Sequence, residues 1–145
     1  MTEFLKKLLA NFVVLQYKHH VIHTDMKGAL FMPFHAFMDS VYSFFGDANI
    51  DLTRERIRIL GDYPCTSLSS VLKDADIEEL QWEVPALGEC MNMVRDDLKK
   101  MMAVIDAGIE ISAEEKDLIT QNMLIDFSAE LWKFEWKLRS TLGMK

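Results

Sequence analysis

The first 24 residues of the chain carry apolar and polar positions at the period of a helix. The apolar stripe consists of Phe4, Leu5, Leu8, Leu9, Phe12 and Val13, and Lys6, Lys7 and Lys18 lie off it. Because an amphipathic helix repeats its apolar positions every three or four residues, the pattern predicts a helix over residues 3–24. The Lys27–Gly28 pair that follows is expected to end this helix.

Two further long helices are predicted in the middle of the chain. The second helix begins near Pro33, whose missing amide hydrogen is harmless in a first turn, and runs to about Leu60. Gly61 fits the position just after its C-terminal cap. The third helix spans roughly residues 86–107 and is expected to stop at Gly108.

The last long helix is predicted to begin at Ser112, because the sequence Ser-Ala-Glu-Glu forms a capping box, and to run to about Leu142. A long connection over residues 61–84 separates the second helix from the third, and Thr66 or Ser67 could cap a short helix within it. No strand, repeat or low-complexity segment is predicted. The pattern therefore indicates an all-α chain of four long helices with one long middle crossover.

Composition narrows the classes of protein that fit. The 145 residues are half hydrophobic and 27% charged, which predicts one globular domain over residues 1–145. The net charge of −7 argues against unaided nucleic-acid binding and favours attraction of cations. No uncharged stretch is long enough to cross a membrane, and no secretory signal opens the chain. Cys65 and Cys90 have no metal or redox spacing, so we expect a reduced, cytoplasmic location.

Candidate metal chemistry is concentrated in the second predicted helix and just before it. His35 and Asp39 are four residues apart, and so are Asp51 and Glu55. Residues four apart share one face of a helix. His23 lies shortly upstream, before the predicted turn. Imidazole and carboxylate together form a ligand set that suits iron, zinc or manganese.

One helix cannot bring both pairs to the same metal. Glu55 follows His35 by twenty residues, which is about 30 Å along a helix. The midpoint of these two residues is position 45, and the midpoint of Asp39 and Asp51 is the same position. A two-fold axis near Phe45–Gly46 would therefore place the first pair of one chain opposite the second pair of another.

Structural explanations for these residues remain open at this stage. A single histidine on an apolar helix is more often a core or surface residue than a ligand. His19 and His20 have no carboxylate partner at helical spacing, and we interpret them as surface or supporting residues. Glu55 has three neighbouring arginines as alternative partners, and Asp51 could be a solvated helix residue.

The spaced combination of these residues resembles the Dps miniferritins, the DNA-protection-during-starvation family. The shared pattern consists of His23, Gly28, Phe31, His35, Asp39, Asp51, Glu55, Arg56, Gly61 and Pro64. The resemblance continues through residues 66–79 and 122–143, and so covers nearly the whole chain. It implies an all-α, ferritin-like four-helix bundle with a short extra helix in the long middle crossover.

The resemblance also implies an activity and a ligand set. In the family, two iron ions bind between two subunits, are oxidised there by peroxide or oxygen, and are stored as ferric mineral in a hollow shell. His23, His35 and Asp39 would come from one chain, and Asp51 and Glu55 from the other, with zinc or manganese as possible substitutes for iron. No histidine has a glutamate three residues before it, which excludes the Glu-x-x-His site of other ferritin-like proteins and favours the intersubunit site.

Two positions depart from the family pattern. Thr24 stands where the family usually has a tryptophan, which leaves open any radical-quenching role of that residue. The spacing of twelve residues between Asp39 and Asp51 is one longer than usual. At roughly 100° per residue, a regular helix would turn Asp51 and Glu55 about 120° away from the metal-facing side. We therefore predict a single-turn π-bulge or equivalent irregularity between Phe45 and Ile50; the rival is a straight helix and a dead site.

Three classes of function follow from the sequence. The first is an iron-oxidising enzyme that assembles as a dodecamer of two-fold dimers, with iron and peroxide as its partners. The second is a structural shell with an inactive metal site. The third is a DNA-binding protein, which is disfavoured because family members that bind DNA commonly use basic tails and this chain offers only short ends. Family pores suggest an iron entry near Glu114, Glu115 and Asp117, although Asn122 replaces an acidic residue of some relatives.

Overall fold

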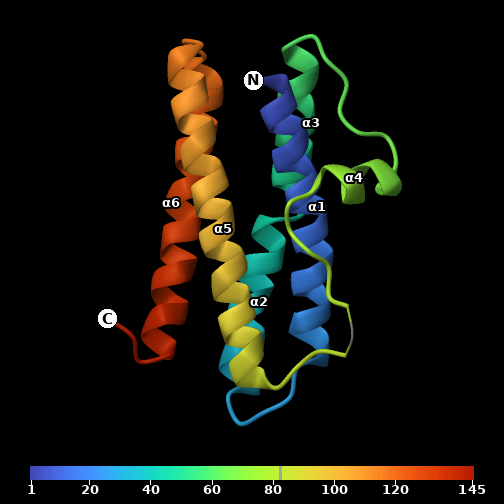
Figure 1. Ribbon diagram of the computed structural model, residues 1–145. Helices are drawn as coiled ribbons and strands as arrows, with labels where there is room; N and C mark the ends of the chain where they lie inside the picture. Colours follow the sequence, from blue (N-terminus) through green and yellow to red (C-terminus); the bar gives the residue numbers. More distant parts are fainter. Residues whose placement is uncertain (82) are drawn as a thin grey trace. The chain divides into compact units, whose positions relative to one another are not determined.

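The computed structural model describes residues 1–81 and 83–145, and helices joined by irregular connections make up this part of the chain. Its six helices are α1 (Thr2–Asp25), α2 (Phe31–Phe44), α3 (Asp47–Ile59), α4 (Leu68–Asp74), α5 (Leu87–Glu114) and α6 (Leu118–Thr141) (Figure 1). The described part contains no strand, as the sequence predicted, and no helix in it is long and apolar enough to cross a membrane.

Tertiary contacts group the chain into two compact units. One comprises residues 2–90, and the other comprises residues 91–145 together with Met1. The expectation of one domain over residues 1–145 stays a prediction. The unit of residues 2–90 contains every candidate metal ligand.

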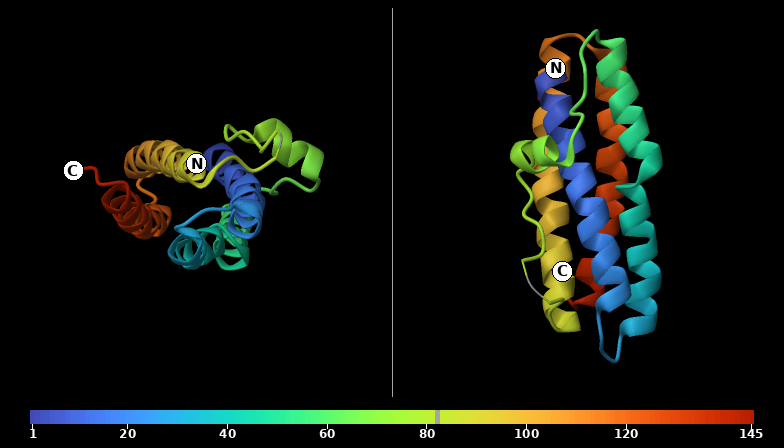
Figure 2. Two further views of the ribbon diagram at one scale, coloured as in Figure 1. Left: turned by 90° about the horizontal axis from the view of Figure 1, so that it is seen from below. Right: turned by 90° about the vertical axis from the view of Figure 1, so that its right-hand side faces the viewer.

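Helix α1 is the core element of the unit that contains the ligands. It packs against α2, α3 and α4, and both views of Figure 2 show it beside them. Its fully buried apolar side chains are Leu5, Leu8, Leu9, Ala10, Phe12, Leu15 and Ile22. Each large apolar side chain contributes about 1.5–3 kcal/mol when it leaves water. The predicted helix over residues 3–24 is confirmed.

The predicted single helix from Pro33 to Leu60 is wrong, because the chain breaks at Phe45 and Gly46. Phe45 caps the end of α2, and Gly46 has an extended ψ of −159°. The Gly46 amide donates to the Ser43 carbonyl at 3.0 Å, three residues back, and Ile50 starts the next helix by donating to the Gly46 carbonyl. The irregularity predicted in this region is present, but it is a helix break and not a π-bulge.

Two sets of contacts hold the break in place. Phe45 is fully buried and contacts Phe12 and His19 of α1, with ring centroids 5.5 and 5.6 Å away. The Asn49 side-chain amide donates to the Phe44 carbonyl at 2.7 Å. That side chain takes the place of a backbone donor that the break removes, so the interruption leaves this carbonyl satisfied.

The break also resets which face of the helix is buried. Phe34, Met38, Val41 and Phe45 form the buried stripe before it. On a straight helix buried positions recur every three or four residues, so the stripe would continue from Phe45 to Leu52. Leu52 is instead 44% exposed, whereas Thr53 and Ile57 are fully buried. The break therefore absorbs one residue of the sequence.

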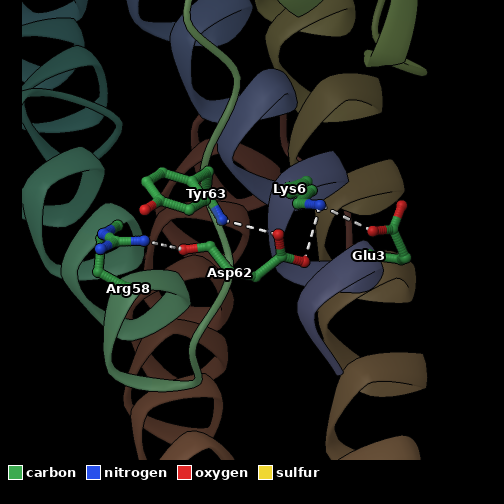
Figure 3. Close-up of polar contacts among 5 residues, drawn as sticks. All are labelled: Glu3, Lys6, Arg58, Asp62 and Tyr63. Carbon is green, nitrogen blue, oxygen red and sulfur yellow. Dashed lines mark hydrogen bonds and ion pairs between the residues drawn. The ribbon is translucent and has the colours of Figure 1, made fainter.

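The end of α3 is tied back to the start of α1. Gly61 adopts a φ of +90°, and the amide of Asp62 donates to the Ile57 carbonyl at 3.1 Å, which confirms the predicted glycine cap. The Asp62 carboxylate then pairs with Lys6 at 2.8 Å and accepts the Tyr63 amide at 2.7 Å (Figure 3). Lys6 also pairs with Glu3 at 2.8 Å.

The long middle connection contains the predicted short helix. The Ser67 hydroxyl caps α4 by accepting the Ser70 amide, and the Ser70 hydroxyl in turn accepts the Ser67 amide. This reciprocal capping box confirms the prediction of a cap at Thr66 or Ser67. Residue 82 of the predicted connection lies outside the described residues.

The predicted boundary between the last two helices is wrong. Helix α5 continues through Gly108 to Glu114, and Ser112 lies inside it, where its hydroxyl donates to the Ile109 carbonyl. Asp117 caps α6 instead, by accepting the Thr120 amide at 3.1 Å. A helix tolerates one glycine at a cost of about 1 kcal/mol when its neighbours are packed.

Within the unit of residues 91–145, a buried carboxylate links α5 to α6. Glu135 is 5% exposed. It accepts a hydrogen bond from Arg95 of α5 at 3.0 Å and another from Arg139 of α6 at 3.1 Å. Two guanidinium groups compensate the cost of burying this charge.

Candidate metal site

His23 of α1 and His35 of α2 form a reciprocal pair. The Nδ1 atom of His23 lies 3.0 Å from the backbone oxygen of His35, and the Nδ1 atom of His35 lies 2.9 Å from the backbone oxygen of His23. The two rings are stacked, with centroids 3.8 Å apart and planes inclined by 19°. Two helices are thus joined by their candidate ligands.

These hydrogen bonds fix the chemistry of both rings. A carbonyl oxygen only accepts, so each Nδ1 carries the hydrogen. In the neutral ring the lone pair then resides on Nε2, which is free to bind a metal. His23 is 8% exposed and His35 is half-buried. Each ring therefore presents an Nε2 atom that could accept a metal ion.

Asp39 lies one helical turn after His35 and three residues before Tyr42. The nearby Asp39 carboxylate raises the pKa of Tyr42 above its ordinary value, and desolvation adds to the rise. The Tyr42 ring stacks on His20 of α1, with centroids 4.5 Å apart, and meets His23 edge-on at 5.0 Å.

Asp51 and Glu55 lie together on α3 and are both exposed in the single chain, as Asp39 is on α2. Because the core-facing stripe of α3 has moved to Thr53 and Ile57, these carboxylates are turned away from the core. Glu55 also lines an open groove of about 580 Å³.

Two of the arginines beside Glu55 are engaged elsewhere. Arg54 donates to the Cys65 carbonyl at 3.3 Å, and Arg58 donates to the Asp62 carbonyl at 2.8 Å. Arg58 also covers the ring of Tyr63 at 3.9 Å. These contacts account for Arg54 and Arg58 without Glu55 as a partner.

The ligands of a single chain do not form a complete site. Within the described residues, no three side chains of His, Cys, Asp or Glu are close enough together to hold a metal ion. The His23–His35 pair with Asp39 provides one half of a ligand set, and Asp51 with Glu55 provides another.

Tyr42 was not singled out from the sequence, and His20 was interpreted only as a surface or supporting residue. Their positions carried a signal, because Tyr42 follows Asp39 by three residues and His20 precedes His23 by three. Such pairs share a helix face. The contact between the two rings joins different helices and depends on tertiary packing, which spacing alone does not give.

The two cysteines take no part in the site. Both are free thiols, Cys65 half-buried and Cys90 buried. Burial raises the pKa of each thiol above its ordinary value, so neither is activated as a nucleophile or ligand.

Known proteins match this chain over almost its full length. The family model that describes the ferritin-like domain matches residues 2–144. The DNA protection during starvation protein of Listeria monocytogenes is 34% identical over 97% of this chain and 90% of its own length. The chain belongs to the Dps family. Its Helicobacter pylori relative of the same name is 29% identical over 97% of each chain.

Solved Dps structures agree with the fold. Dps from Listeria innocua aligns with a TM-score of 0.92 at 33% identity, covering 99% of this chain and 96% of that one. Dps from Listeria monocytogenes aligns with a TM-score of 0.93 at 33% identity, covering 99% and 93%. The all-α, ferritin-like four-helix bundle predicted from the sequence is confirmed, and the Dps membership supports an iron-binding, miniferritin role.

Proposed function

We propose that this Dps protein binds ferrous iron at sites shared by two chains, oxidises it and stores the ferric product in a hollow shell. His23, His35 and Asp39 of one chain and Asp51 and Glu55 of another are the proposed ligands, with two iron ions per site. The reciprocal hydrogen bonds of His23 and His35 carry this proposal, because they engage both Nδ1 atoms and leave both Nε2 atoms as candidate metal ligands.

The donor set suits the reaction. Histidine nitrogens bind ferrous iron without adding charge, and the three carboxylates compensate the charge that grows on oxidation. Two ferrous ions supply the two electrons that reduce one hydrogen peroxide to two hydroxide ions, so no radical is released. Crystals of Listeria innocua Dps have been soaked with zinc and with cobalt, and we infer that both ions, and manganese, can replace iron here.

A shared site requires assembly, and we infer a dodecamer built from two-fold dimers. The single chain exposes large apolar side chains on α6, among them Trp132 and Trp136, which are 54% and 56% exposed. Such surfaces are typical of contacts between subunits. The free cysteines fit a reducing cytoplasm. Light scattering is expected to show twelve chains, and a stable monomer at micromolar concentration would contradict the shell.

The deciding experiment is a ferrous oxidation time course, with and without hydrogen peroxide, on the wild type and on His35→Ala. The wild type is expected to oxidise iron and the variant to be much slower. A matched control is Asp106→Ala, which removes an exposed carboxylate from α5. An inactive wild-type shell of normal size would favour the second candidate, a structural Dps shell.

A further inference from the structure

We propose that Met32 of one chain packs against Ile59 of a second copy, in the groove beside Glu55, and so fixes the register of the two chains. The inference rests on the proposed two-chain iron site and adds to each such site one apolar contact. The occupant of the groove is therefore a second copy of this chain.

The groove lies at the C-terminal end of α3 and is open in the single chain. It has a volume of about 580 Å³, and Glu55, Ile59 and Tyr63 are among the residues that line it. Ile59 is 72% exposed and Tyr63 is 70% exposed. Arg58 covers the Tyr63 ring at 3.9 Å and donates to the Asp62 carbonyl at 2.8 Å, so this side of the groove is held in place within the single chain (Figure 3).

Met32 has the complementary position on α2. It precedes His35 by three residues, whereas Arg58 and Ile59 follow Glu55 by three and four residues. Met32 therefore lies one helical turn outside its ligand pair, and so does Ile59. A two-fold axis that places His35 opposite Glu55 in antiparallel helices also places Met32 opposite the edge of the groove formed by Arg58 and Ile59.

The ligand-bearing faces alone would repel each other before iron binds. Each shared site brings together three carboxylates, those of Asp39, Asp51 and Glu55, and like charges at short range oppose the contact. Burial of exposed apolar side chains supplies a compensating attraction. Met32 is 73% exposed and Ile59 is 72% exposed in the single chain, so both side chains leave water when the two copies meet.

Disulfide formation tests the contact itself and needs no iron. Met32→Cys and Ile59→Cys are introduced together in a Cys65→Ser background, and the apo shell is oxidised with diamide. Figure 2 shows α2 and α3 as consecutive segments that run end to end. Ile59 follows Met32 by 27 residues, which is about 40 Å along such helices. This distance is too long for a disulfide within one chain, so any bond between the two positions joins two chains.

We expect the double-cysteine chains to run mostly as dimers on non-reducing gels. The matched control pairs Met32→Cys with Leu52→Cys in the same background. Leu52 is also an exposed apolar residue of α3, at 44%, but it lies seven residues before Ile59, which is about two helical turns. In the proposed register this pair is too far apart to form a bond.

A second set of variants measures how strongly Met32 holds the chains together. Met32→Asp should raise the protein concentration at which the shell dissociates by about tenfold or more, because a charge replaces an apolar anchor of the interface. Met32→Leu keeps the apolar volume and should assemble as the wild type does. Met144→Asp, at another exposed methionine, is the control. Circular dichroism should show unchanged helix content in all three variants, since both positions are exposed in the single chain.

The outcomes separate this contact from the iron site. If the Met32→Cys, Ile59→Cys pair forms no more dimer than the control pair, while the wild-type shell assembles and oxidises iron, the Met32 contact is wrong and the iron site stands. A Met32→Asp shell that dissociates at the wild-type concentration would overturn the anchoring role of Met32. A wild-type chain that stays monomeric would overturn both proposals.

Discussion

Asn11 illustrates how one buried side chain supports the segment that follows α4. It is fully buried in α1, and its side-chain oxygen accepts the amides of Asp76 and Ile77 at 2.8 and 3.1 Å. The two donors lie 65 and 66 residues away in the sequence. Such a contact is invisible to periodicity, because an asparagine within an apolar stripe gives no indication of which backbone it will meet.

We predict that Asn11→Leu destabilises the protein by roughly 2–4 kcal/mol, because the buried amide of Ile77 and the partly buried amide of Asp76 lose their acceptor. Calorimetry at fixed protein concentration should show the lower unfolding temperature. Asn92→Leu, at an exposed position of α5, is the control and should stay close to the wild type. Equal unfolding temperatures for the two variants would show that the amides find other partners.

The contacts of Asp62 lead us to predict that the protein loses folding stability in acid. Lys6 and the Tyr63 amide, which Figure 3 shows beside Asp62, and Thr2 lower the pKa of the Asp62 carboxyl from 3.8 to about 2. A pKa that is lower in the folded state stabilises the protein above the unfolded value, and this contribution is lost as the pH falls from about 4 to about 2. Asp62→Asn should therefore unfold more easily at neutral pH and lose part of the wild-type decline in that window.

Thermal unfolding from pH 7 to pH 2 measures this difference. Asp106→Asn, which changes an exposed carboxylate on α5, is the matched control. If the unfolding temperatures of the wild type and of Asp62→Asn differed by the same amount at every pH down to 2, the ion pair of Asp62 with Lys6 would not cause the loss of stability in acid.

At the scale of the elements, Lys116 marks the boundary between α5 and α6, which was predicted from the sequence at the wrong position. It has a φ of 58°, and the Asp117 amide donates to the Ser112 carbonyl at 2.9 Å, so Lys116 occupies the position where helices usually place glycine. The capping box at Ser112 and the glycine at position 108 both pointed to an earlier end. Local propensity was outweighed by continued burial on α5, at Ile105 and Ser112.

We predict that Lys116→Gly stabilises the protein by up to about 1 kcal/mol, because glycine adopts the left-handed conformation without the clash of a side chain. Lys99→Gly, inside α5, is the control and should destabilise by about 1 kcal/mol. Unfolding temperatures measure both. A lower value for Lys116→Gly would mean that the lysine side chain makes a stabilising contribution of its own.

Other element boundaries could be predicted because their signals are local. Gly61 and Ser67 lie where the caps were expected. The break at Gly46 was predicted as an irregularity, because the spacing of the aspartates conflicted with a straight helix. Its form could not be predicted, since it depends on the packing of Phe45 against α1 and on the Asn49 side chain.

At the scale of the whole molecule, the proposed site is shared by two chains. We predict that Asp51→Ala and Glu55→Ala slow iron oxidation at least about tenfold, since even partners outside the ligand set contribute that much. The shell should still assemble, because the interface is not held by these carboxylates alone. Oxidation kinetics and light scattering measure the two properties separately, and Asp106→Ala is the control.

If both variants oxidise iron at the wild-type rate, the ligands assigned to α3 are wrong. A monomer formed by either variant would show instead that these carboxylates hold the interface. The sequence supplied the five candidate ligands through spacing and resemblance. It could not supply the geometry across the interface, because no contact within one chain defines it.

We also predict no appreciable DNA binding at physiological salt, although the relatives are named for DNA protection. The net charge of −7 repels phosphate, and binding of a protein to DNA depends on cations that neutralise the backbone. Plasmid mobility in gels should be unchanged by the shell at about 150 mM salt, where the Debye length is roughly 8 Å. Clear retardation of the plasmid under these conditions would show that the protein does bind DNA.

At the break at Phe45–Gly46, the chain can gain or lose a residue without a change in the geometry of the candidate site. A codon gained or lost inside α2 or α3 would rotate every later side chain of that helix by about 100°. At Gly46 the direction of the helix is set again by Phe45 and Asn49, so the same insertion or deletion leaves the next helix in phase. This junction is therefore where the gene can vary in length while both halves of the site are kept.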